Sequence, residues 1–237
     1  MKFLLKKAPF LTGPLRSYFN YLFGEKEIRY FSKYLRKYKN NFIFIDVGAN
    51  YGVYTFMFGG ISEFTYAIEP ISECIDYIDK GYINKNIEFI NKVASNNTEN
   101  KILNIPIENN QKVYGRSSLN NNFNKFEQII SESFKLDELL ENIKRLNSEL
   151  LFIKIDVEGH ENLVIEGTSE LFKYKKSILL IEIESRHNEK YQDLIENLTE
   201  NKFVAYYVKK NKLIKIEDLN EFIEIMKYNI NFVFKNY

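Results

Sequence analysis

Apolar residues in this chain recur in short β-rich runs, and segments with helical spacing separate these runs. A run that is apolar at nearly every position is typical of a strand buried on both faces of a parallel sheet. Helices are expected to start near Gly52 and Ser72, between successive runs. Strands that alternate with helices predict a parallel sheet with helices on both faces. The expected strands are Phe42–Val47, Phe64–Ile68, Ile87–Val93, Leu150–Ile155 and Ile178–Glu184.

The C-terminal part of the chain, residues 185–237, departs from this alternation. The pattern there predicts two helices, two strands and a turn. The expected elements are a helix near Lys190–Thr199, a strand Phe203–Val208, a turn Lys209–Lys212, a helix Asp218–Met226 and a last strand Ile230–Phe234.

The middle of the chain, residues 95–150, is the least regular part. We expect only a short strand, Lys101–Ile107, and a helix, Glu138–Leu146, with Asp137 as its N-cap. A connection this long inside a compact domain is usually functional, for example as a lid or a binding loop.

The first 40 residues are basic and aromatic, and residues 17–38 have a helical period. We interpret them as a helical cap that packs apolar side chains onto the core or over a bound cofactor. Those side chains are Leu15, Phe19, Leu22, Phe23 and Phe31. The alternative is a basic amphipathic element, residues 1–23, that makes weak peripheral contact with a membrane surface.

A glycine-containing turn follows the first strand and carries the strongest chemical signal. Gly48 and Gly52 allow a sharp turn and a close approach of the backbone to a ligand, and the helix after them presents free N–H groups. The spacing does not fit the dinucleotide motif G-x-G-x-x-G. Asp46 would repel a pyrophosphate but suits a cationic amino-acid group, and Glu69 ends the second strand, where a ribose diol is held. Together these features favour S-adenosylmethionine (SAM) over NAD or ATP.

Three strings in the sequence resemble the FkbM-type family of SAM-dependent methyltransferases. They are Asp46-Val-Gly-Ala-Asn-Tyr-Gly52, Glu69-Pro70 and Phe152-Ile-Lys-Ile-Asp-Val-Glu-Gly-His-Glu161, and the last is the most specific. The resemblance runs from about residue 40 to the C-terminus. It implies an α/β fold of the class I SAM-methyltransferase (Rossmann-like) type. The expected sheet has seven strands, is mostly parallel with a C-terminal antiparallel hairpin, and carries helices on both faces.

The resemblance also implies an activity, a domain organisation and a cofactor site. The usual activity of the family is O-methylation. The methyltransferase domain would comprise residues 41–237 and follow the helical cap of residues 1–40, and the protein would form a single domain overall. The segment Lys92–Ala94 would approach the adenine. Ser117 and Ser118 would either face the active site or lie in a surface turn. The expected SAM-binding residues are Asp46, Gly48, Ala49, Asn50, Gly52, Glu69, Pro70, Val93 and Ala94.

Acidic residues gather at the expected carboxyl ends of the strands, where ligands of open α/β sheets bind. A hydroxyl acceptor must lose its proton during methyl transfer, so a base is required. The candidate bases are Asp156 and His160, with Glu158 and Glu182 as assisting residues. Histidine has the more suitable unperturbed pKa for this role. Asp156 could instead cap the following helix, and Lys154 could pair with an acidic neighbour. The Asp156-x-Glu158-x-His160 string could also ligate a divalent cation, which we do not favour; no metal site is predicted.

The composition of the chain limits its possible partners, its compartment and its function class. The formal net charge of +1 gives no general attraction to nucleic acid, and the single cysteine, Cys74, excludes an intrachain disulfide and favours the cytoplasm. No stretch approaches the roughly 20 apolar residues of a membrane span. The predicted acceptor is a small molecule, a sugar or a surface glycan, as in polysaccharide biosynthesis. A non-catalytic SAM-binding subunit and an NAD-dependent oxidoreductase are the alternative functions.

Overall fold

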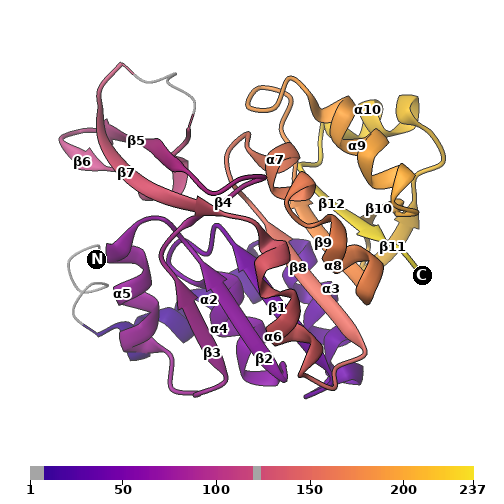
Figure 1. Cartoon of the computed structure of the whole chain (residues 1–237), viewed down its shortest axis with the longest axis horizontal. Coiled ribbons are helices and arrows are strands. Elements are labelled where there is room, and N and C mark those ends of the chain that lie inside the picture. Colours follow the sequence, from indigo (N-terminus) through magenta and orange to yellow (C-terminus); the bar gives the residue numbers. More distant parts are fainter. Residues whose placement is uncertain (1–7, 120–123) are drawn as a thin grey trace.

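The computed structural model describes residues 8–119 and 124–237, and its centre is a mixed sheet of eight strands (Figure 1). Five parallel strands form one half in the order β3 (Ile87–Ile90), β2 (Phe64–Ile68), β1 (Phe42–Val47), β8 (Leu150–Ile155) and β9 (Lys176–Glu182). The other half continues with β12 (Asn231–Lys235), β10 (Val204–Lys209) and β11 (Lys212–Lys215), each antiparallel to its neighbour. The result is an α/β fold with a large mixed sheet.

Strands β1 and β8 lie in the middle of this sheet, and every residue in them is buried. Their register pairs Ile45 with Ile153 and Asp46 with Lys154. Because parallel neighbours in register point to the same face, Asp46 and Lys154 lie on one side of the sheet. The predicted bounds of β1, β2 and β8 are confirmed, since their apolar runs match strands that are covered on both faces.

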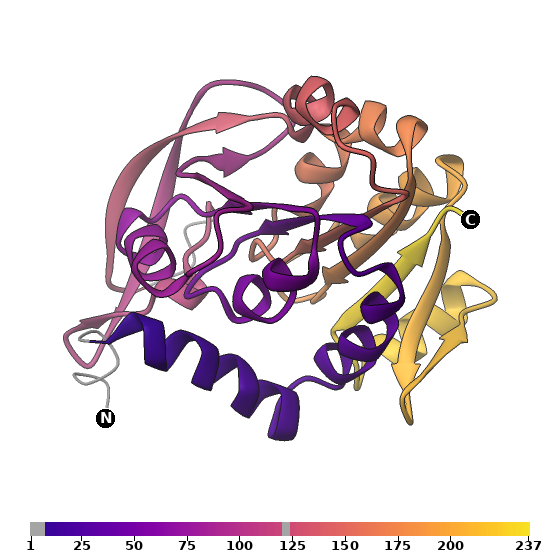
Figure 2. The ribbon, with the colours of Figure 1, turned by 90° about the horizontal axis from the view of Figure 1, so that it is seen from below.

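Helices cover both faces of the sheet (Figures 1 and 2). On one face, the rings of Phe44, Phe58 and Phe152 pack together with centroids 5.4–5.7 Å apart. That face carries α2 (Pro9–Phe23), α3 (Lys26–Tyr34), α4 (Val53–Phe58) and α5 (Ser72–Gly81). The opposite face carries α6 (Leu140–Lys144), α7 (Glu161–Glu166), α8 (Ser169–Tyr174), α9 (Tyr191–Glu200) and α10 (Leu219–Met226). Short 3₁₀ turns are η1 (Leu35–Tyr38), η2 (Gly59–Ile61), η3 (Tyr114–Arg116) and η4 (Leu136–Leu139).

The prediction of seven strands is wrong, because β11 adds an eighth. Of the segment Lys209–Lys212, which we expected to be a turn, only Lys210 and Asn211 form the turn, because Lys209 pairs with Lys212. Lys210 and Asn211 both have left-handed backbone angles, with φ of 49° and 60°. Two such residues make the tight turn that suits a two-residue hairpin, so the chain folds straight back as β11.

A second sheet occupies most of the region that we expected to be irregular. Its order is β4 (Val93–Ala94), β7 (Phe126–Phe134), β5 (Asn100–Glu108) and β6 (Gln111–Lys112), and it projects beyond the main sheet in Figure 1. The pattern hid β7 because Ser131 and Ser133 are buried while Ile130 is 72% exposed. The predicted strand Ile87–Val93 is therefore also wrong, since it divides into β3 and β4, which belong to different sheets.

Asp137 caps a helix other than the predicted one. Its carboxylate accepts hydrogen bonds from the backbone N–H groups of Glu170 and Leu171, at the start of α8. The expected helix Glu138–Leu146 is instead divided between η4 and the short α6. Asp137 thus ties the end of β7 to the helix layer.

The N-terminal helices only partly fulfil the predicted packing. Phe31 in α3 is fully buried. Four other expected core residues of α2 are exposed, which makes the prediction wrong for Leu15, Phe19, Leu22 and Phe23. None of the described helices is long and apolar enough to cross a membrane.

Candidate functional site

The turn after β1 has a backbone shape that only particular residues allow. Gly48, Asn50 and Gly52 all have positive φ angles, of 75°, 48° and 74°. A Cβ atom on Gly48 would lie 1.9 Å from the carbonyl oxygen of Asp156, so only glycine fits. The turn therefore lies directly against the end of β8, and the ends of two central strands meet at one edge of the sheet.

Glu69 holds this turn from the end of β2. Its Oε2 accepts a hydrogen bond of 2.8 Å from the backbone N–H of Asn50, and its Oε1 accepts one of 3.0 Å from Ile71. The side chain is 6% exposed, and burial raises the pKa of Glu69 to about 7. Each carboxylate oxygen keeps a second lone pair for a ligand.

Asp46 lies beneath the turn rather than in an open space. It is 2% exposed, and its Oδ2 accepts a hydrogen bond of 2.6 Å from the Thr55 hydroxyl in α4. Burial raises the pKa of Asp46 to about 6. Its observed contact joins β1 to α4, so Asp46 supports the turn from below.

A cleft opens above these residues and brings most of the predicted ones together. It encloses about 620 Å³, including open solvent at its mouth. Of the predicted residues it is lined by Gly48, Asn50, Glu69, Pro70, Val93, Ala94, Asp156, Glu158 and His160. Asp46, Ala49, Gly52 and Glu182 are not among its lining residues.

The far wall of the cleft comes from η3 and the residues after it, and it includes Tyr114, which the sequence reasoning missed. Ser117 also lines the cleft, and its hydroxyl is buried without a hydrogen-bond partner among the described residues. The Ser118 hydroxyl instead donates a hydrogen bond of 2.9 Å to the carbonyl of Glu158. Since buried polar groups are normally paired, the Ser117 hydroxyl is available to a ligand.

Lys154 is a buried cation that organises the carboxylates at the end of β8. Its Nζ lies 3.6 Å from Asp156 and 4.0 Å from Glu182, and it also lies 5.3 Å from the centre of the Tyr54 ring. Burial alone would lower the pKa of Lys154, but the two carboxylates raise it above its usual value. The ion pair supports the prediction that Lys154 pairs with an acidic neighbour. Asp156 is one of these neighbours, and it does not cap the following helix.

Glu182 is the last residue of β9, not an interior residue of a longer strand as predicted. It therefore reaches the same edge as Asp156, where it lines a smaller cleft of about 200 Å³ with its mouth open to solvent. Burial, together with the charge of Asp156, raises the pKa of Glu182 to about 8 and that of Glu158 to about 7. This acidic cleft is lined by Asp156, Glu158, Gly159, Glu161, Glu182, Glu184 and His187. Asp156 and Glu158 line both clefts and form the boundary between them.

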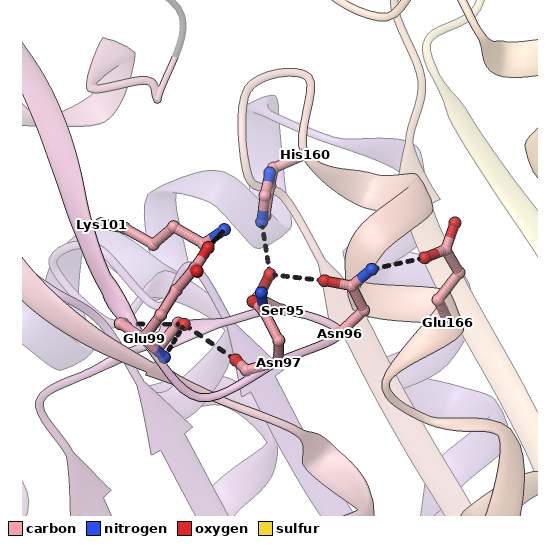
Figure 3. Close-up of polar contacts among 8 residues, drawn as sticks. Ser95, Asn96, Asn97, Glu99, Lys101, His160 and Glu166 are labelled. Atoms are coloured by element: carbon pink, nitrogen blue, oxygen red, sulfur yellow. Dashed lines mark hydrogen bonds and ion pairs between the residues drawn. The ribbon is translucent and has the colours of Figure 1, made fainter.

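His160 faces the β4 side of the larger cleft (Figure 3). Its Nε2 lies 3.0 Å from the Ser95 hydroxyl, which in turn contacts Asn96. Burial, with a smaller effect from the charge of Lys101, lowers the pKa of His160 to about 4. The imidazole is neutral at pH 7, and its pKa lies well below the neutral range that made histidine attractive as a base. Ser95 was missed in the sequence, although it directly follows Val93-Ala94.

Acidification is expected to destabilise the protein through His160. The folded-state pKa lies below the unfolded value of 6.5, so the stability contributed by neutral His160 is present above pH 6.5 and is lost as the pH falls toward 4. At pH 4.5 the loss is about 2.5 kcal/mol. Urea unfolding at pH 7 and 4.5 should therefore show a smaller acid loss for His160→Gln, in which the amide can still bond Ser95. His187→Gln, at the other histidine, should behave more like the wild type; an equal acid loss in all three proteins would contradict the assignment.

The described residues include no group of three or more His, Cys, Asp or Glu side chains arranged to hold a metal ion. The carboxylates of Asp156 and Glu182 lie beside the Lys154 ammonium.

Comparison with known proteins identifies the family. The methyltransferase FkbM domain matches residues 46–229, most of the chain, and the chain therefore belongs to the FkbM methyltransferase domain family. No curated protein matches the chain.

Solved structures of methyltransferases are similar at low identity. An FkbM methyltransferase from Methylobacillus flagellatus KT is 15% identical, with a TM-score of 0.48, over 81% of this chain and 42% of that one. A tRNA (m1A58) methyltransferase from Aquifex aeolicus is 11% identical, with a TM-score of 0.42, over 89% of this chain and 67% of that one. An rRNA methylase from Streptococcus thermophilus is 11% identical, with a TM-score of 0.43, over 86% of this chain and 91% of that one. This chain thus spans less than half the length of the FkbM structure.

Proposed function

We propose that this protein is a SAM-dependent methyltransferase that methylates a hydroxyl group of a sugar, a glycan or another small hydroxylated acceptor. The observation that carries the proposal is the larger cleft, in which separate segments after β1, β2, β3 and β8 supply the predicted residues. Family membership supports methyl transfer as the reaction.

The residues of the larger cleft fit SAM in three respects. Glu69 offers carboxylate lone pairs to a ribose diol, while Val93 and Ala94 offer a small apolar wall to an adenine. The carboxylates of Asp156 and Glu158 give the cleft a negative wall, which suits the sulfonium and ammonium charges. The Ser117 hydroxyl, which has no hydrogen-bond partner in the described part of the chain, gives a further polar contact.

SAM supplies an electrophilic methyl group, and the protein's part is to orient the acceptor oxygen and to receive its proton. Holding the two reactants in near-attack geometry is worth up to roughly 7–11 kcal/mol. Asp156 is the proposed proton acceptor, because its carboxylate lies at the boundary of both clefts and is fixed by Lys154. When Asp156 takes the proton, its charge no longer raises the pKa of Glu182, so the Glu182 carboxylate can serve as the counter-ion of the Lys154 ammonium.

The smaller cleft is the proposed acceptor site. Its walls carry five acidic side chains and His187; the ionised carboxylates among them accept hydrogen bonds from hydroxyl groups and repel anions. An uncharged, hydroxyl-rich acceptor therefore fits better than a phosphorylated or carboxylated one. This argument favours a neutral sugar unit over a nucleic acid, whose phosphates would face the same carboxylates.

The proposal is tested by incubating the purified protein with methyl-labelled SAM and separate pools of neutral sugars, acidic sugars and RNA. We expect S-adenosylhomocysteine to form only with a hydroxylated acceptor, preferably the neutral pool, and the label to appear in an O-methyl ether. Label on a nucleobase would refute the acceptor class. Cofactor binding without turnover on any pool would favour the non-catalytic SAM-binding subunit.

A further inference from the structure

Helix α2 packs against the protein through its small residues and turns its large apolar residues outward. On the packed side, a Cβ atom on Gly13 would collide with the Phe56 ring, and the Ser17 hydroxyl donates a hydrogen bond of 2.8 Å to the carbonyl of Val53. The outward side chains are 40–80% exposed, namely Phe10, Leu11, Leu15, Tyr18, Phe19, Leu22 and Phe23. Figure 2 shows α2 along the lower edge of the molecule, with no other described element beneath it.

These outward residues form one continuous stripe rather than scattered positions. Leu11, Leu15, Tyr18 and Leu22 follow the spacing of one helical face, and Phe19 and Phe23 lie beside them. The Phe19 and Phe23 rings are 6.3 Å apart. A contiguous apolar surface of this kind marks an interaction site.

The charges around the stripe indicate what kind of surface it meets. The charged side chains among residues 1–24 are Lys2, Lys6, Lys7 and Arg16, all basic, although the whole chain has a net charge of only +1. The three lysines belong to residues 1–7, which lie outside the described residues, so their charge is known from the sequence alone. An apolar helix face whose own segment, residues 1–24, carries only basic charge is complementary to an anionic lipid surface.

The helix also contacts the rim of the larger cleft. The guanidinium of Arg16 lies 5.3 Å from the centre of the Tyr51 ring, which belongs to the turn after β1. The Tyr51 ring is in turn 6.3 Å from the ring of Tyr114, on the far wall of the cleft. A surface that binds α2 would therefore lie close to the mouth of this cleft.

We propose that α2 is a membrane-docking helix that lies flat on an anionic lipid surface with its apolar stripe in the interfacial region. The aromatic residues suit the boundary between headgroups and acyl chains, and the helix is already folded against α4 and α5, so binding requires no new ordering of its backbone. The inference is independent of the proposed methyl transfer, since it needs neither cofactor nor acceptor.

The experiment is co-sedimentation of the full chain with vesicles of phosphatidylcholine alone, and with vesicles that also contain phosphatidylglycerol. We expect at least about tenfold stronger binding to the anionic vesicles, because each lysine near such a surface contributes about fivefold. The double variant F19E/F23E should lose at least about tenfold in binding. The double variant K6Q/K7Q should lose preference for the anionic vesicles.

Exposed apolar residues elsewhere on the chain provide the matched control. Ile130 is 72% and Tyr228 is 69% exposed, so I130E/Y228E makes the same chemical change outside α2 and should bind vesicles as the wild type does. The proposal would be overturned if the wild type bound neither kind of vesicle. It would also be overturned if I130E/Y228E lost as much binding as F19E/F23E. Light scattering provides the other decisive outcome: a wild-type dimer that F19E/F23E dissociates, without vesicle binding, would assign the stripe to a second copy of the chain.

Discussion

Replacing Asp156 with asparagine is expected to remove methyl transfer while leaving cofactor binding close to normal. The substitution keeps the shape of the side chain but removes its ability to take a proton from the acceptor hydroxyl. General-base catalysis contributes about 10²–10⁴-fold, so turnover should fall by that factor. The buried Lys154 ammonium keeps Glu182 at 4.0 Å as its counter-ion, and the cluster should therefore stay folded.

Two measurements separate this result from a general loss of structure. S-adenosylhomocysteine formation should collapse for Asp156→Asn, while the affinity for added S-adenosylhomocysteine stays within about threefold of the wild type, because this product lacks the positive sulfonium charge and the contacts assigned to Glu69 are untouched. Asp193→Asn, an exposed residue of α9, should turn over normally. Wild-type turnover in Asp156→Asn would exclude Asp156 as the base and shift attention to Glu158.

Glu69→Gln is expected to give the largest loss of cofactor affinity. Glu69 accepts from the N–H groups of Asn50 and Ile71 through both oxygens, but the amide NH₂ of glutamine would oppose one of these donors. The variant would also lose charge-assisted hydrogen bonds to the ribose. With such bonds worth about 1.5–3 kcal/mol, the affinity for S-adenosylhomocysteine should fall by about a hundredfold.

The loss of affinity is measured from the rise in melting temperature that S-adenosylhomocysteine produces. A variant that binds the ligand more weakly shows a smaller rise at the same ligand concentration, because the stabilisation of the folded state depends on how tightly the ligand binds. Glu88→Gln is the matched control, an exposed glutamate on the neighbouring strand β3, and should give the full wild-type shift. If Glu69→Gln also gave the full shift, the cofactor would have to bind elsewhere.

The central part of the fold could be predicted from the sequence because its strands are buried on both faces. In β1 and β8 burial on both sides requires apolar residues throughout, apart from Asp46 and Lys154, and the strand ends follow directly from where those runs stop. The polar residues after the strands then meet at one edge by the geometry of parallel sheets. This is why most of the predicted residues line one cleft.

The parts that the sequence did not predict depend on contacts between distant segments. The second sheet buries Ser131 and Ser133 and exposes Ile130, the reverse of the usual pattern. Likewise, the low pKa of His160 arises from burial and from Lys101 on β5, which no local pattern reveals. Leu15 and Phe19 look like core residues by their spacing, but the close packing of Gly13 and Ser17 turns them outward.

The most direct test of the cofactor assignment is calorimetric titration of the purified protein with S-adenosylhomocysteine, beside an identical titration with NADH. We predict binding in the micromolar range for S-adenosylhomocysteine and none for NADH, because the turn after β1 lacks the dinucleotide motif and lies over the carboxylate of Asp46. Binding of NADH instead would contradict the account and support an oxidoreductase. Binding of neither ligand would contradict the assignment of the larger cleft as a SAM site.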